Sequence, residues 1–144
     1  MNHATVFVRC AIGASFLSAA ADRFGLWGAY GQPHVAWGNF SRFTVYTGTL
    51  LWFLPAIVHP LMAWTATAGE IVFGLALIVG LFTRVVAFLS GILLLTFALT
   101  MTFSLGIKAP LDFSVFSASA GAFLLAALGE YPWSLDRLRR SRST

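Results

Sequence analysis

Apolar residues along this chain gather into four long runs that charged residues hardly interrupt. The runs cover residues 4–21, 61–80, 85–105 and 113–128. A hydrocarbon core of about 30 Å requires about 20 helical residues at about 1.5 Å per residue, and the runs approach that length. The pattern therefore predicts an all-α, integral membrane four-helix bundle that forms a single membrane domain over residues 1–144.

The segment between the first two runs, residues 22–60, follows a different pattern. Its first half is broken by several glycines, and aromatic residues are dense throughout. Asn39 or Ser41 is suited to cap a short helix that would run to Leu54, before Pro55. Such a helix is too short to cross a membrane, and its aromatic side chains are typical of the headgroup boundary. We expect an aromatic-rich interfacial segment that forms a lid; an irregular loop anchored by its rings fits the pattern equally well.

The composition is that of a membrane protein, and the basic residues are concentrated near the C-terminus. The chain is 58% hydrophobic and only 10% charged, with a mean hydropathy of +0.82. The net charge of +4 could indicate nucleic-acid binding, but the last eight positions hold four of the nine basic residues. That placement is typical of a tail at a membrane surface, so we expect no nucleic-acid partner.

The distribution of basic residues also predicts an orientation. Four spans leave both chain ends on one side, and that side carries Arg84 and the four arginines of the tail, residues 129–144. The other side carries Arg23, Arg42 and Lys108. Because basic residues favour the cytoplasmic side, we expect both termini to be cytoplasmic and the lid to lie outside.

Two charged residues lie inside the predicted spans. Glu70 is near the middle of the second span, where a carboxylate costs on the order of 2.5–3.5 kcal/mol on insertion scales, and Arg9 is in the first span. We expect Arg9 and Glu70 to form an intramembrane polar pair, because one extended arginine bridges the predicted depth difference of roughly 8 Å. Three roles stay open: neutralisation that fixes helix register, a proton or quinone site at Glu70, and a protonated glutamate with a single hydrogen bond.

Three further polar residues, Asp22, Arg23 and His59, are predicted at the outer mouth of the first two spans. Asp22 and Arg23 are neighbours, so they point in different directions from a helix end and need separate partners; they also suit an interfacial stop signal. His59 could relay protons near neutral pH or act as a hydrogen-bonded loop histidine. The single cysteine, Cys10, allows no disulfide within the chain. The sequence predicts no metal site and no self-contained catalytic group, and whether the protein is an enzyme stays open.

Several motifs resemble the DoxX family of small four-helix membrane proteins. They are Arg9, Gly13 and Phe16 in the first span, the block AGEIVFGLALIVGLFTRVVAFLSGILLLTF at 68–97, and the ending at 129–136 with its SLD. The resemblance implies a bundle in a bacterial-type cytoplasmic (inner) membrane. Some relatives are linked to quinone-coupled sulfur oxidation or to membrane-associated redox complexes.

From the resemblance we expect an accessory subunit of a quinone-linked or redox-associated membrane system. It has no intrinsic cofactor, a quinone is the cofactor implied, and redox-enzyme subunits and the lipid bilayer are the expected partners. One alternative is a small proton-coupled transporter, motivated by Glu70. Another is a membrane assembly or scaffold protein, motivated by small-residue faces such as that of Ala11, Ser15 and Ser18.

Overall fold

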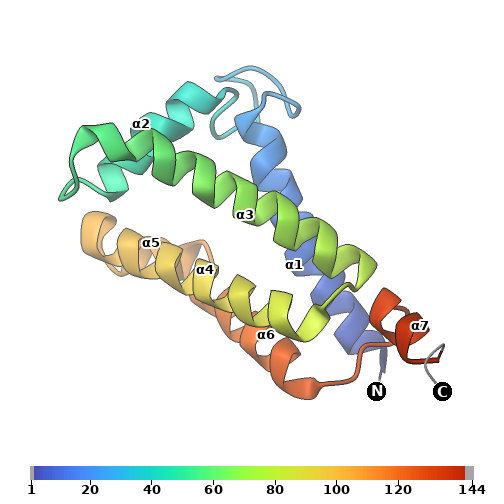
Figure 1. Ribbon diagram of the computed structural model, residues 1–144. Helices are drawn as coiled ribbons and strands as arrows, with labels where there is room; N and C mark the ends of the chain where they lie inside the picture. The colour runs from blue at the N-terminus through green and yellow to red at the C-terminus, as the bar shows by residue number, and fades with distance from the viewer. Residues whose placement is uncertain (1, 142–144) are drawn as a thin grey trace.

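The computed structural model describes residues 2–141, and in that range the chain is helical with no strand (Figure 1). The helices are α1 (Asn2–Arg23), α2 (Phe40–Leu50), a 3₁₀ turn (Ala56–Val58), α3 (His59–Val79), α4 (Thr83–Leu105), α5 (Lys108–Asp112), α6 (Val115–Leu128) and α7 (Leu135–Ser141). α2 lies at one end of the bundle and α7 at the other (Figure 1). We call these the lid end and the tail end.

Local sequence explains where α3 and α4 begin and end. Pro60 occupies the first turn of α3, where its missing N–H has no intrahelical partner to lose. Gly80 ends α3 in a left-handed conformation, with φ of 72°, and donates its N–H to the carbonyl of Ala76. The chain then turns at once into α4, which ends at Gly106. A tight connection between the second and third spans was expected, and the structure contains one.

The helices pack as two antiparallel pairs in which small residues allow close approach. α1 crosses α3 at Gly13 and Gly74, where a Cβ added to Gly13 would lie 2.8 Å from the Gly74 carbonyl oxygen. α4 packs on α6, with the Ser119 hydroxyl donating to the Gly91 carbonyl at 2.8 Å. Such contacts are typical of membrane helices, whose association depends on packing and hydrogen bonds.

The core lies where these two pairs meet. Its buried residues come from α1, α3, α4, α6 and the chain that follows α6. They are Ile12, Phe16, Leu77, Val86, Ala87, Leu94, Ala122, Leu125, Ala126 and Tyr131. The first residues of α1 and the whole of α7 lie at the tail end, so both ends of the described chain are on one side of the bundle (Figure 1).

Three helices are long and apolar enough to cross a membrane: α1, α3 with the 3₁₀ turn before it, and α4. The fourth segment, expected over 113–128, is the helix α6, which is shorter than the other three. α6 has 14 residues, which reach about 21 Å, and Ser114, with φ of 56°, separates it from the short α5. Asp112 and Ser114 favour turns and caps over helix interiors, which accounts for the break. α5 and α6 together run back along α4.

The lid segment contains elements of both structures expected for it. Residues 24–39 form an irregular loop, and α2 then begins after Asn39, whose side chain accepts the N–H of Arg42 at 3.0 Å. The helix ends at Leu50 and not at Leu54, because the chain turns over the residues before Pro55.

Candidate functional site

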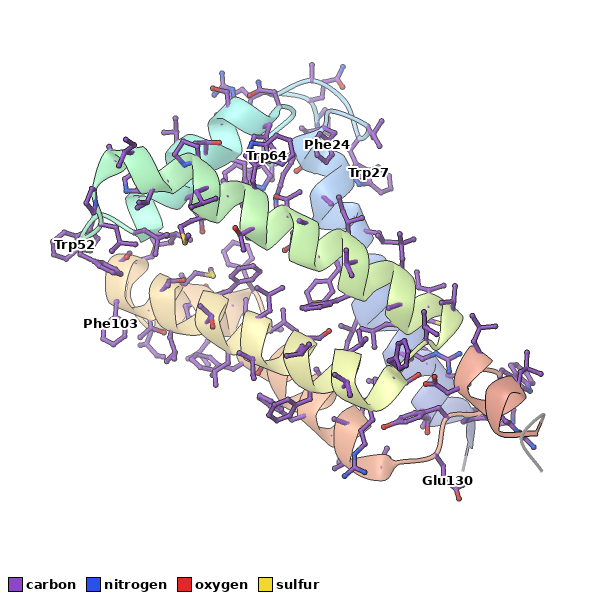
Figure 2. The ribbon with its side chains drawn as sticks, viewed as in Figure 1. Phe24, Trp27, Trp52, Trp64, Phe103 and Glu130 are labelled. Atoms are coloured by element: carbon purple, nitrogen blue, oxygen red, sulfur yellow. The ribbon has the colours of Figure 1, made fainter. Side chains whose placement is uncertain are left out.

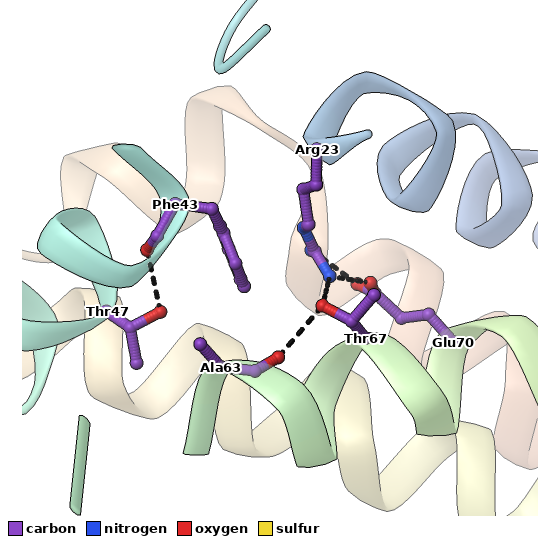
Figure 3. Close-up of polar contacts among 6 residues, drawn as sticks. All are labelled: Arg23, Phe43, Thr47, Ala63, Thr67 and Glu70. Carbon is purple, nitrogen blue, oxygen red and sulfur yellow. Dashed lines mark hydrogen bonds and ion pairs between the residues drawn. The ribbon is translucent and has the colours of Figure 1, made fainter. Parts of the chain in front are cut away.

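A buried ion pair joins α1 to α3 near the lid end of the bundle (Figure 3). Arg23, the last residue of α1, lies on the same buried face as Phe16 and Ala20. Its two terminal nitrogens bind the two carboxylate oxygens of Glu70, and Nη1 also donates to the Thr67 hydroxyl at 2.7 Å. Paired bonds of this kind are the strongest form of arginine–carboxylate contact.

The pair is enclosed on its remaining sides. The guanidinium carbon of Arg23 lies 3.6 Å from the ring centroid of Phe43 in α2, and the Thr67 hydroxyl donates to the Ala63 carbonyl at 2.8 Å. The side chains of Arg23 and Glu70 are 5% and 4% exposed. Both carboxylate oxygens are thus occupied and the whole cluster is shielded from lipid and water, an arrangement suited to fixing three helices against one another.

The structure corrects the expectation that Arg9 pairs with Glu70. Arg9 is buried at the tail end, where it donates to the carbonyls of Pro132 at 3.1 Å and Trp133 at 2.6 Å. The crossing at Gly13 and Gly74 sets the register of the two helices. Four residues before Gly13, Arg9 is level with position 78, which is eight residues beyond Glu70 and therefore about 12 Å away along α3.

The sequence does contain a signal that makes Arg23 a second candidate partner. Arg9, Ile12, Phe16, Ala20 and Arg23 recur at three- and four-residue spacing, which places both arginines on one helical face. The expected first span stopped at residue 21, and so left Arg23 outside the membrane helix. α1 instead continues through Arg23, and the long side chain reaches back along α3 to the carboxylate.

Asp22 points away from its neighbour and closes the lid loop onto α1. Its carboxylate accepts backbone N–H groups from Ala36 at 2.9 Å, Trp37 at 3.1 Å and Gly38 at 3.3 Å. The adjacent charges at the end of α1 therefore have separate partners, one in the loop and one in the bundle. Asp22 fixes the loop, and Arg23 fixes α3.

His59 begins α3 and holds the turn that precedes it. Its Nε2 lies 3.2 Å from the Leu51 carbonyl oxygen and 3.1 Å from that of Leu54. Because both partners are acceptors, Nε2 carries the proton. His59 precedes Glu70 by eleven residues, about 16 Å along α3. The structure therefore does not bring His59 into the ion-pair cluster.

A groove of about 690 Å³ runs along the opposite, exposed face of α1 at the lid end. Small residues of α1, namely Ala14, Ser15 and Ser18, form its floor, and the lid loop supplies its walls. Trp27, which donates its indole N–H to the Ser18 carbonyl at 3.1 Å, lies along the outer flank of α1 (Figure 2). His34 and Trp37 complete the wall, and Asp22 closes the end of the groove. We call this the α1 groove.

At the tail end, the chain after α6 is fastened to α3 and α4. The Asp136 carboxylate accepts the N–H groups of Phe82 at 2.8 Å and Thr83 at 2.7 Å, and so caps α4. The Asp136 N–H donates to the Gly80 carbonyl at 3.0 Å, and Ser134 contacts the Tyr131 carbonyl at 2.5 Å. Together with Arg9, these contacts give the SLD ending a structural role.

The fold and these contacts define an all-helical membrane protein with a sealed charge pair and an aromatic groove beside it. The chain belongs to the DoxX family, whose model matches residues 4–103. The match takes in α1, the lid segment, α3 and most of α4, which are the elements that build the ion pair and the groove. Comparisons with curated proteins and with solved structures gave no match.

Proposed function

We propose that this protein is an accessory subunit of a quinone-linked or redox-associated membrane system, and that it holds a quinone in the α1 groove. The observation that carries the proposal is the groove itself, with its small-residue floor and two tryptophan walls. Redox-enzyme subunits in the same membrane are the proposed partners that exchange electrons with the quinone. This chain binds the quinone and orients it.

The residues of the groove fit a quinone in size and chemistry. Small-molecule sites are typically clefts of about 300–1,000 Å³ with apolar and aromatic walls and a few polar groups. Trp27 and Trp37 offer flat apolar surfaces to a quinone ring, and the His34 imidazole offers a hydrogen-bond donor to a ring carbonyl. The floor belongs to the exposed face of a spanning helix, so an isoprenoid tail would extend into lipid.

The environment of Glu70 supports this site over a transport pathway through the same carboxylate. A carrier residue must exchange protons or substrate with both sides of the membrane. Glu70 is buried and binds Arg23 through both oxygens, so exchange would require α1, α2 and α3 to separate. The groove needs no such movement, because it is already open on the surface.

Quinone retention tests the proposal. The protein is purified in mild detergent, extracted with organic solvent, and assayed for quinone per mole of protein by chromatography. Ala14→Leu fills the floor and should lower retention at least about tenfold, equivalent to about 1.4 kcal/mol. Ala11→Leu is the matched control, since Ala11 is exposed one turn earlier on α1 and does not line the groove.

Two results would reject the quinone site. One is a wild-type protein that carries no quinone and does not take up added quinone. The other is equal retention by Ala14→Leu and Ala11→Leu. Loss of quinone in Glu70→Gln with full retention in Ala14→Leu would indicate that the quinone binds inside the bundle near Glu70 and not in the α1 groove.

A further inference from the structure

A second groove, of about 410 Å³, lies at the tail end between the last turn of α3 and α7. Val79 forms one side, and Trp133, Leu135, Arg137 and Leu138 form the other. Its apolar side chains are open to the surface: Trp133 is 73% exposed and Leu138 is 60% exposed. Tryptophan and leucine at the end of a spanning helix are suited to the membrane boundary, where one side meets lipid and the other meets headgroups.

The wall of this groove is fixed to the bundle. Arg9 holds the backbone at Pro132 and Trp133 from inside, and Asp136 bonds both to Gly80 and to the start of α4. The groove therefore has a defined shape at a defined depth. A flexible basic tail would not present a groove of fixed shape at a fixed depth.

The charged side chain that lines the groove is Arg137. The carboxylate of its neighbour, Asp136, is turned to the start of α4, where it binds two backbone N–H groups. Arginine is suited to phosphate because its guanidinium donates two parallel hydrogen bonds. The combination of an arginine with an open apolar channel favours a ligand that has both a phosphate and an acyl chain.

We propose that the tail-end groove binds one anionic phospholipid. Arg137 contacts the headgroup phosphate, and the acyl chain lies along Val79, Trp133 and Leu138. Inorganic phosphate would gain nothing from the apolar wall, and a zwitterionic lipid would gain less from the charge of Arg137. The bound lipid would join α7 to the end of α3, and so hold the tail against the membrane surface.

Native mass spectrometry of the purified full chain tests this, with phosphatidylglycerol and phosphatidylcholine added in competition. We expect phosphatidylglycerol to bind preferentially to the wild type. Arg137→Gln should weaken that binding about fivefold, the effect of one arginine at a membrane surface. Leu138→Ser should weaken it without any change in charge. Both side chains are exposed, so neither variant should disturb folding.

Arg84→Gln is the matched control, because Arg84 is exposed at the same end of the bundle but does not line the groove. If the groove is a specific site, phosphatidylglycerol binding should fall clearly in Arg137→Gln and change little in Arg84→Gln. Equal losses in the two variants would mean diffuse attraction to the surface and would overturn the proposal. Equal binding of the two lipids by the wild type, or displacement of phosphatidylglycerol by inorganic phosphate at the same concentration, would also overturn it.

Discussion

The buried pair of Arg23 and Glu70 allows a quantitative test by a double-mutant cycle. Removal of one partner of a buried ion pair typically costs about 3–5 kcal/mol, because the other charge is left without a partner. Glu70→Leu leaves the guanidinium with the Thr67 hydroxyl, and Arg23→Met leaves a buried carboxylate without its counter-charge. When both are replaced by apolar residues of similar size, the cost should fall to about 2 kcal/mol or less. The coupling energy should therefore be at least about 4 kcal/mol.

The measurement is reversible unfolding of the purified protein in mixed micelles, with all variants compared in one detergent. A second cycle, with Arg9→Met and Glu70→Leu, serves as the control. Because Arg9 is about 12 Å from Glu70 along α3, its coupling energy should be within about 0.5 kcal/mol of zero. A larger coupling energy for Arg9 than for Arg23, or additive effects in the Arg23 cycle, would refute the assignment of the pair.

Two further predictions concern packing and capping. Gly13→Ala should lower the free energy of unfolding by about 1–3 kcal/mol, because the new Cβ would lie 2.8 Å from the Gly74 carbonyl oxygen. Gly121→Ala is the control: a Cβ there would have no atom within 4 Å, so the variant should be neutral or more stable by up to about 1 kcal/mol. Thermal melts check both, and equal melting temperatures for the two variants would contradict the crossing. Asp136→Ala should lower the free energy of unfolding by about 1–2 kcal/mol and speed amide hydrogen exchange in the first turn of α4. Asp112→Ala breaks an exposed ion pair with Lys108 and should lower it by less than about 0.5 kcal/mol. Unchanged exchange in Asp136→Ala would mean that the cap is dispensable.

Hydropathy alone predicted the class of fold and its four main helices. α1, α3 and α4 match expected runs to within about two residues at each end, because bilayer thickness imposes a strict length on an apolar helix. The fourth run, 113–128, likewise corresponds to a helix, α6, but its 14 residues make it shorter than the other three. The start of α6 at Val115 depends on a left-handed Ser114, which a hydropathy profile does not report.

The partner of Glu70 was missed for a different reason. The two arginines of α1 are equally well placed by helical spacing, so the choice depends on the register in which α1 crosses α3. Gly13 and Gly74 determine that register through direct backbone contact, and neither has a distinctive signal in a hydropathy profile. The α1 groove was likewise beyond prediction, because the hydrogen bonds of Asp22 bring Trp37 back to α1 from fifteen residues away.

The contrast between the two arginines explains why the spanning helices hold a glutamate. Arg9 is buried at the tail end, where both terminal nitrogens of its guanidinium donate to backbone carbonyls and it forms no ion pair within the described residues. Arg23 instead extends inward under Phe43, so a full counter-charge is needed at that depth. Glu70 supplies that charge, and its presence requires no catalytic or transport role. The chemistry of the protein should therefore be sought on the other face of α1, where the same helix offers small residues to the α1 groove.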